Sequence, residues 1–164
     1  MKLVVMSDSH GDKETVKAVS ALPADAIFHC GDSELSFDDP LLHNMHRVRG
    51  NCDRDARFPS SVLVEVQGKK VLAVHGHEHD VRVSLMGLYY SAKELGADVV
   101  LFGHSHLYGA EMKDGILFLN PGSTVQPRGG KKATYAVVEW DATLHVTFKN
   151  LKHETVEKKE MKNI

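Results

Sequence analysis

Short apolar runs that each end in a polar cluster recur along this chain, and this order constrains the fold more than any other feature. Every cluster contains a glycine, which permits a tight turn and lets the backbone approach a ligand closely. Most of the other residues are aspartate, asparagine and histidine. The clusters are Asp8-Ser9-His10-Gly11, Gly31-Asp32, Gly50-Asn51-Cys52-Asp53, His75-Gly76-His77 and Gly103-His104-Ser105-His106.

The apolar runs predict strands and helices that alternate in the first part of the chain. We expect strands at Leu3–Met6, Ala26–Cys30, Met45–Val48 and Val99–Phe102, helices at Asp12–Leu22 and Val83–Leu95, and hairpins at Val62–Val66 with Lys70–Val74, around Asp114-Gly115 and around Asp141-Ala142. Asp12 is placed to cap the first helix, and Gly96 to end the second. The first part is thus β-α-β-like and the last third antiparallel, which predicts mixed sheets with outer helices in an α/β architecture.

The length of 164 residues suits a single domain spanning residues 1–164, with a charged tail from about Lys152 that we expect to be solvated or frayed. The apolar run at the start is too short for a signal peptide. No stretch reaches the roughly 18 apolar residues of a transmembrane helix, so we expect no membrane association. Cys30 and Cys52 form no disulfide framework, and a cytoplasmic location is therefore expected.

The polar clusters are expected to meet at one site. In open α/β sheets, ligands bind beyond the carboxyl ends of the strands, which is where each cluster falls. In an extended segment residues i and i+2 face the same way, so Asp8 with His10 and His104 with His106 are predicted to project as pairs. Carboxylate, imidazole and amide donors without thiolate suit Mn²⁺, Fe or Zn²⁺ better than a sulfur-bound structural zinc.

Each cluster taken alone has a structural alternative. Gly-Asp is a common turn dipeptide, and the His-Gly-His cluster is also compatible with a loop of exposed imidazoles. The joint occurrence of these clusters after successive apolar runs favours a metal site, because independent loops would have to collect the same residue types.

In order, the series Asp-x-His, Gly-Asp, Gly-Asn, His-Gly and Gly-His-x-His resembles the calcineurin-like metallophosphoesterases, from Lys2 to about Glu139. The short length, the form Gly-Asn-Cys-Asp and the later Asn120-Pro121-Gly122-Ser123 resemble the small bacterial and archaeal phosphodiesterase branch. The resemblance implies a four-layer α/β/β/α sandwich of two mixed β-sheets flanked by helices. It also implies two divalent metal ions as cofactors, with manganese favoured and Ni²⁺, Zn²⁺ or Fe as alternatives.

Carried over residue by residue, the resemblance implies two sets of metal ligands that share one carboxylate. One metal ion would take Asp8, His10, Asp32 and His106, and the other would take Asp32, Asn51, His75 and His104. We expect Asp32, Asn51 and His75 to be catalytic residues, and we add His77 as a candidate for a reason given below. The implied reaction is hydrolysis of a phosphate ester, a diester in preference to a monoester, by direct attack of a hydroxide that bridges the two cations.

One position departs from the larger family, in which a histidine often follows Gly-Asn and protonates the leaving group or binds phosphate. Cys52 occupies that position here, and a thiol cannot supply a cationic contact. Either the enzyme favours esters with good leaving groups, or another residue takes over this role. His77 is our candidate substitute, against a purely structural role for the same side chain.

The main alternative is a catalytically inactive protein-interaction scaffold of the same fold. Asp32 and Asn51, both of the type needed to hold two metal ions, favour the enzyme. The net charge of −2 and the lack of aromatic residues interleaved with basic ones argue against an extended nucleic-acid track. We therefore expect a small phosphate-ester substrate, whose identity does not follow from the sequence. A homo-oligomer is compatible with the short apolar strands.

Overall fold

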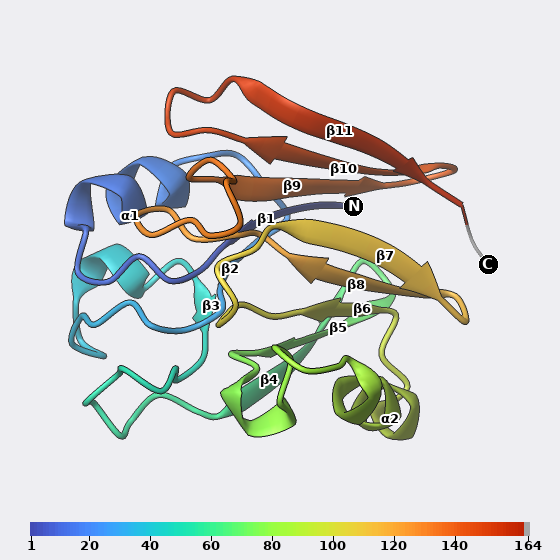
Figure 1. Cartoon of the computed structure of the whole chain (residues 1–164), viewed down its shortest axis with the longest axis horizontal. Helices are drawn as coiled ribbons and strands as arrows, with labels where there is room; N and C mark the ends of the chain where they lie inside the picture. The colour runs from blue at the N-terminus through green and yellow to red at the C-terminus, as the bar shows by residue number, and fades with distance from the viewer. Residues whose placement is uncertain (163–164) are drawn as a thin grey trace.

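Two β-sheets pack face to face in the computed structural model, which describes residues 1–162 (Figure 1). The first sheet has the order β11-β10-β9-β1-β2-β3, made of β1 (Lys2–Met6), β2 (Ala26–His29), β3 (His46–Arg47), β9 (Tyr135–Trp140), β10 (Leu144–Lys149) and β11 (Thr155–Met161). The second has the order β4-β5-β6-β8-β7, made of β4 (Ser61–Val66), β5 (Lys69–Val74), β6 (Val99–Leu101), β7 (Gly109–Lys113) and β8 (Ile116–Asn120). Each sheet contains parallel and antiparallel pairs, so both are mixed as predicted.

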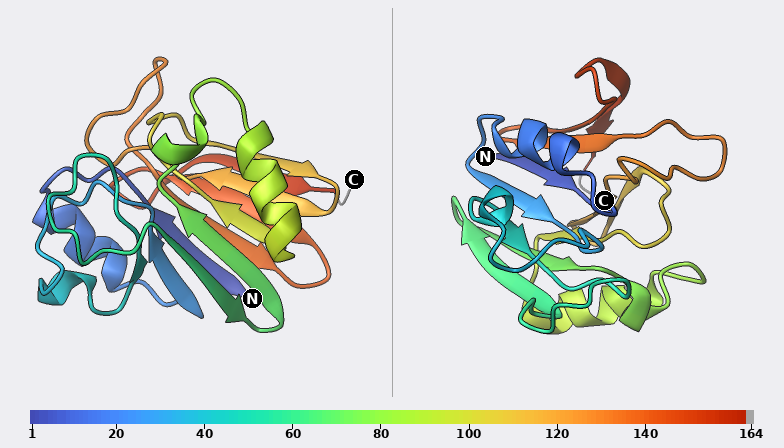
Figure 2. Two further views of the ribbon diagram at one scale, coloured as in Figure 1. Left: turned by 90° about the horizontal axis from the view of Figure 1, so that it is seen from below. Right: turned by 90° about the vertical axis from the view of Figure 1, so that its left-hand side faces the viewer.

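Helices cover the outer faces of the two sheets, as Figure 2 shows. They are α1 (Lys13–Ser20) and α2 (Met86–Leu95), with two short 3₁₀ helices, η1 (Pro40–Leu42) and η2 (His77–His79). Asp12 caps α1 by accepting a backbone hydrogen bond at 3.3 Å, and Gly96 ends α2 with a φ of 69°, both as predicted. α2 begins at Met86 rather than at Val83, because the residues before it form turns and Met86 N–H donates to Ser84 Oγ.

Three hydrophobic clusters correspond to the contacts between layers. The central cluster joins the two sheets, with Leu3 of β1 against side chains such as Leu101 of β6 and Leu117 of β8, all fully buried. One outer cluster joins α1 to the first sheet, and another joins α2 to the second. The layers thus run helix, sheet, sheet, helix, which confirms the predicted α/β/β/α sandwich.

Strand β1 contributes to two of these clusters at once. Leu3 and Val5 lie in the central cluster, whereas Val4 and Met6 lie in the outer cluster beneath α1. Because successive side chains of a strand point to opposite faces, a strand covered on both sides is apolar throughout. This explains why Leu3–Met6 is a continuous apolar run that leads directly into a polar loop.

The charged tail of the chain forms the edge strand β11, so the expectation of a frayed end from Lys152 is wrong for Thr155–Met161. β11 pairs antiparallel with β10, in a register that sets Lys159 opposite Val146. Met161 packs against the central hydrophobic cluster, a contact that the charged composition conceals. Several charged side chains of β11 stay exposed, which is typical of an edge strand. Residues 163–164 lie outside the described part of the chain.

A helix long and apolar enough to cross a membrane is absent from residues 1–162. The single domain over residues 1–164 and the homo-oligomeric state stay predictions.

Candidate metal centre

The predicted site residues follow the carboxyl ends of strands from both sheets and meet where these strands end. They are Asp8 and His10 after β1, Asp32 after β2, Asn51 after β3, His75 and His77 after β5, and His104 and His106 after β6. β1, β2 and β3 are parallel to one another, as are β5 and β6, so each sheet brings its loops to a common edge.

One group of donor atoms comes from the loops after β1 and β6. His106 Nε2 lies 3.2 Å from Asp8 Oδ1, and His10 Nε2 lies 4.0 Å from the same oxygen. The two imidazole nitrogens are themselves 3.5 Å apart. Side chains from both sheets therefore surround one point with oxygen and nitrogen donors.

A second group comes from the loops after β2, β3, β5 and β6. His75 Nε2 lies 3.2 Å from Asp32 Oδ2 and 3.0 Å from Asn51 Oδ1. His104 Nδ1 lies 3.1 Å from Asn51 Oδ1. Asp32 Oδ2 is also 4.0 Å from His10 Nε2, so the Asp32 carboxylate lies between the two groups.

The environment of the Asp8 carboxylate indicates whether these residues fit a metal ion. Its side chain is fully buried, and Oδ1 accepts no hydrogen bond of good geometry from the described residues. The imidazole nitrogens that face it are His106 Nε2 at 3.2 Å, His75 Nε2 at 3.7 Å and His10 Nε2 at 4.0 Å. A buried carboxylate oxygen without a partner is costly in free energy. A divalent cation with oxygen and nitrogen ligands would satisfy all of these atoms, so the residues present fit a metal ion.

Backbone carbonyl groups hold two of the imidazoles from behind. His75 Nδ1 lies 2.7 Å from the Cys30 carbonyl oxygen, and His106 Nδ1 lies 2.7 Å from the Gln126 carbonyl oxygen. A carbonyl can only accept, so each Nδ1 carries the proton and donates it. Nε2 of each ring is then left to face the site, which is the arrangement found around metal-binding histidines.

The charge of the site follows from burial and from these neighbours. Burial alone would raise the pKa of Asp32, but His75 and a backbone N–H outweigh it and hold that pKa well below its usual range. Burial would likewise raise the pKa of Asp8, yet His106 and His75 keep it lowered. Burial, reinforced by His75, lowers the pKa of His104 to about 4. Near neutral pH the two aspartates are therefore ionised and His104 is neutral, as cation binding requires.

His75 shows the competition between a proton and a cation. Burial would lower its pKa, but Asp32 and Asp8 outweigh burial and raise it. A proton on Nε2 occupies the lone pair that a metal ion would use. Metal binding at this position is therefore expected to release a proton.

The backbone of the site is left-handed at five non-glycine residues. The φ values are 54° at Asp8, 43° at His10, 57° at Asp32, 71° at His104 and 61° at His106. Such conformations are uncommon outside glycine and gather at functional sites. The extended geometry from which we predicted the Asp8–His10 and His104–His106 pairs is therefore wrong, since both segments turn. His104 lies in the Asn51 group, whereas His106 lies in the Asp8 group.

Two glycines make room for the carboxylates. A Cβ atom added to Gly50 would lie 2.0 Å from Asp32 Oδ1, and one added to Gly103 would lie 2.6 Å from Asp8 Oδ2. Neither distance is compatible with a side chain. The clustered glycines predict that the backbone approaches the site closely, and it does so at both positions.

His77 lies at the rim of the second group. Its ring centroid is 5.4 Å from that of His75 and 6.1 Å from that of His104. His77 Nδ1 is buried and has no hydrogen-bond partner among residues 1–162. His77 is therefore near the candidate ligands without joining their donor atoms.

Sequence patterns do not indicate the contacts of Glu34 and Ser7. Glu34 Oε1 lies 3.3 Å from His10 Nδ1, and Ser7 Oγ donates to Asp8 Oδ2 at 2.6 Å. Ser123 Oγ donates to the Asp8 carbonyl oxygen at 2.8 Å, which places the Asn-Pro-Gly-Ser segment beside the site. For Glu34 and Ser7, the only signal in the sequence is their position within two residues of a predicted ligand.

Comparisons with known proteins agree with the fold and the motifs. The family model described as the calcineurin-like phosphoesterase superfamily domain matches residues 1–143. The chain is 40% identical over 141 residues to the Probable metallophosphoesterase YsnB of Bacillus subtilis (strain 168), a match that covers 84% of this chain and 83% of the relative. It is 33% identical over 115 residues to the Phosphodiesterase YfcE of Escherichia coli (strain K12), covering 62% of this chain and 55% of the relative.

A solved structure resembles the whole chain. It is the crystal structure of a conserved protein from Streptococcus pneumoniae TIGR4, described as a predicted phosphoesterase. The TM-score is 0.94 at 40% sequence identity, and the match covers 97% of this chain and 95% of the other.

Proposed function

The chain belongs to the calcineurin-like phosphoesterase superfamily, and we propose that it hydrolyses a small phosphodiester with the help of two divalent metal ions. The observation that carries this proposal is the position of Asp32, whose Oδ2 lies 3.2 Å from His75 Nε2 and 4.0 Å from His10 Nε2. A carboxylate between two groups of donors is suited to bridge two cations and to fix their separation.

We propose the two ligand sets that the family resemblance implies, which share this carboxylate. One consists of Asp8, His10, Asp32 and His106, and the other of Asp32, Asn51, His75 and His104. When bound, the pair of cations would lower the pKa of a water molecule held between them and offset the negative charge that develops on the phosphoryl oxygens. Mn²⁺ is the favoured ion, and Ni²⁺, Zn²⁺ and Fe suit the same oxygen and nitrogen donors.

The side chains themselves orient the reaction. Carbonyl oxygens behind His75 and His106 fix these rings, so their Nε2 atoms need no rearrangement during the reaction. Asp8 is fully buried, which strengthens every electrostatic interaction at its end of the site. His77 at the rim is the candidate to donate a proton to the leaving oxygen.

Two observations support a diester over a monoester. A relative with 33% identity carries the name Phosphodiesterase. In this chain, burial and the Asp32 carboxylate raise the pKa of Cys52 to about 11, so the thiol is neutral near pH 7. A neutral thiol gives no cationic contact to the second negative charge of a monoester, whereas a diester carries only one charge.

Hydrolysis of bis(p-nitrophenyl) phosphate and p-nitrophenyl phosphate by metal-stripped protein, refilled with Mn²⁺, Ni²⁺, Zn²⁺ or Mg²⁺, tests this function. We expect metal-dependent turnover that is faster on the diester and that falls to background in Asp32→Asn. Asp141→Asn, in the exposed turn between β9 and β10, is the matched control and should keep wild-type activity. Absence of turnover with every metal in folded protein would contradict the proposal and favour the inactive scaffold.

A further inference from the structure

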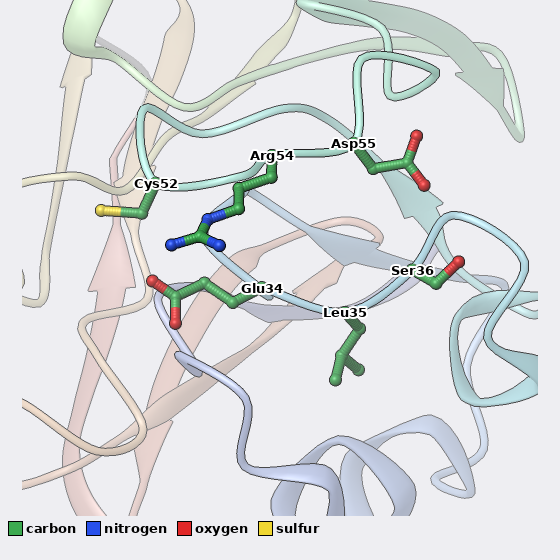
Figure 3. A pocket seen from close by; sticks show the side chains of 6 residues that line it. All are labelled: Glu34, Leu35, Ser36, Cys52, Arg54 and Asp55. Atoms are coloured by element: carbon green, nitrogen blue, oxygen red, sulfur yellow. The ribbon is translucent and has the colours of Figure 1, made fainter.

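A cavity of ≈ 590 Å³ lies beside the candidate metal centre, between the loop after β2 and the loop after β3 (Figure 3). Glu34, Leu35 and Ser36 line it from the first loop, and Cys52, Arg54 and Asp55 from the second. Its volume is within the range of cavities that bind small molecules. None of these six residues belongs to the two proposed ligand sets.

The cavity adjoins the metal centre directly. The Cys52 backbone N–H donates to Asp32 Oδ1 at 2.8 Å, and Glu34 Oε1 lies 3.3 Å from His10 Nδ1. The donor atoms of His10, Glu34 and Cys52 all lie within 4.8 Å of one another. A phosphate ester held at the metal centre would therefore have this cavity next to one of its two ester oxygens.

Both carboxylates that line the cavity already have partners. Asp55 accepts hydrogen bonds from the Arg57 guanidinium at 3.0 and 2.8 Å and from the Phe37 backbone N–H at 2.9 Å. Glu34 faces His10, as described above.

Arg54 is the exception among the charged residues of this wall. Its guanidinium makes no hydrogen bond or ion pair with any part of the chain that the structure describes. Figure 3 shows the guanidinium directed into the space between Cys52 and Glu34. An arginine keeps its charge at all ordinary pH values, and its planar group suits two-pronged contacts with phosphate or carboxylate. The cavity thus presents one unpaired cation next to the reaction site.

We propose that this cavity binds one of the two alcohol groups of the phosphodiester substrate, and that Arg54 selects substrates in which this alcohol carries a second anionic group, a phosphate or a carboxylate. The inference rests on the proposed function, since it names the substrate class of the same site. It also assigns a role to the wall that contains Cys52, the position at which the larger family often has a histidine. A rival role for Arg54 is contact with the reacting phosphate, which would affect all substrates equally.

A matched pair of chromogenic diesters tests the proposal. Thymidine 5′-(p-nitrophenyl phosphate) and its 3′-phosphorylated form differ only by the second anionic group. For the Mn²⁺-loaded wild type, we expect kcat/KM to be higher by about tenfold or more for the 3′-phosphorylated compound, the size of one charged hydrogen-bonded contact. Arg54→Gln should remove this preference and leave kcat/KM for the unphosphorylated compound within about twofold of wild type. Arg54→Lys should retain part of the preference, because it keeps the charge.

Lys93→Gln is the control for loss of one positive charge, since Lys93 is exposed in the last turn of α2 and lines no part of the cavity. This variant should keep the full preference. If the wild type shows no preference, or if Arg54→Gln slows both compounds equally, the proposed selection is wrong.

Calorimetry separates the cavity from catalysis. We expect wild-type protein to bind thymidine 3′,5′-bisphosphate more tightly than thymidine 5′-monophosphate by about tenfold, and Arg54→Gln to bind the two with similar affinity. A wild type that hydrolyses neither chromogenic compound but retains this binding preference would overturn the proposed function alone. Turnover of both compounds with equal binding of the two nucleotides would overturn the cavity proposal alone.

Discussion

Asp53 Oδ2 accepts a hydrogen bond from the backbone N–H of Asp32 at 2.9 Å, and a second from Gly50 N–H at 2.7 Å. Asp53 Oδ1 accepts a third from Glu34 N–H at 2.8 Å. The Asp53 side chain is buried, with only 4% of its residue surface exposed. One carboxylate therefore ties the loop that carries the proposed bridging ligand to the loop that carries Asn51.

Asp53→Asn tests this tie. An amide of the same size turns an NH₂ group toward at least one backbone N–H, so a buried donor loses its acceptor at a cost of about 1–3 kcal/mol in the free energy of unfolding. We also expect about 10- to 100-fold weaker metal binding, the usual effect of removing a residue that orients a ligand. Denaturant unfolding and a Mn²⁺ titration measure the two effects. If metal affinity stayed at the wild-type value while stability fell, Asp53 would be structural only.

Gly50→Ala probes the close approach of the backbone to Asp32. The added Cβ would lie 2.0 Å from Asp32 Oδ1, so either the carboxylate or the loop must move. We expect a stability loss of about 1–3 kcal/mol from overpacking, together with weakened metal binding. Gly87→Ala is the control, because its Cβ meets nothing closer than 3.5 Å and alanine favours helices. Unchanged metal affinity in Gly50→Ala would contradict the close contact between the Gly50 backbone and the Asp32 carboxylate.

His29 predicts a specific pH dependence of stability in metal-free protein. The ring is buried, its Nε2 lies 2.8 Å from Ser9 Oγ, and Gly31 N–H donates to its Nδ1. Burial lowers the pKa of His29 from 6.5 to about 4. Between pH 6.5 and pH 4, His29 is therefore protonated in the unfolded chain but stays neutral in the folded chain. The stabilisation is therefore complete above pH 6.5 and is lost as the pH falls toward 4, by about 2–3 kcal/mol.

Unfolding of wild type and His29→Gln at pH 7.5 and pH 4 checks this sign. His29→Gln should be less stable at pH 7.5 but should lose about 2 kcal/mol less on acidification. His43→Gln, at an exposed position, should follow the wild type at both pH values. Equal losses in wild type and His29→Gln would mean that other groups cause the acid sensitivity.

His77→Ala tests the candidate proton donor. An alkoxide leaving group needs a proton much more than a nitrophenolate does, so this variant should slow an alkyl ester more than an aryl ester. We expect a loss of about 10²-fold for the alkyl ester and a smaller one for bis(p-nitrophenyl) phosphate. Equal, wild-type turnover of both esters would leave His77 with a structural role.

Local pattern was enough to predict mixed sheets with outer helices and the position of the site, whereas the four layers were predicted from the family resemblance. Four of the polar clusters follow a buried apolar strand, as with Met6 before Asp8, whereas the cluster that contains Asn51 follows the short polar strand β3. The paired projection of His104 with His106 failed because it assumed extended backbone, whereas both residues have positive φ. Sequence spacing cannot report that angle, since it results from the contacts of the folded loop.

The contacts that orient the site are equally hidden in the sequence. Asp53 acts on backbone N–H groups of Asp32 and Glu34, 21 and 19 residues away, and a backbone donor has no residue signature. Strand β11 was missed for a related reason. The charged residues of β11 are typical of an exposed segment. Its pairing with β10 and the contact of Met161 with the core form only in the tertiary fold, so local sequence does not indicate them.

The central claim is that one carboxylate, Asp32, bridges two metal ions. Crystals soaked in Mn²⁺, with data collected to record the anomalous signal of manganese, test it most directly. We expect two peaks about 3.5–4 Å apart, each within coordination distance of an Asp32 oxygen, and the loss of at least one peak in Asp32→Asn. A single peak, or two peaks of which only one touches Asp32, would contradict it.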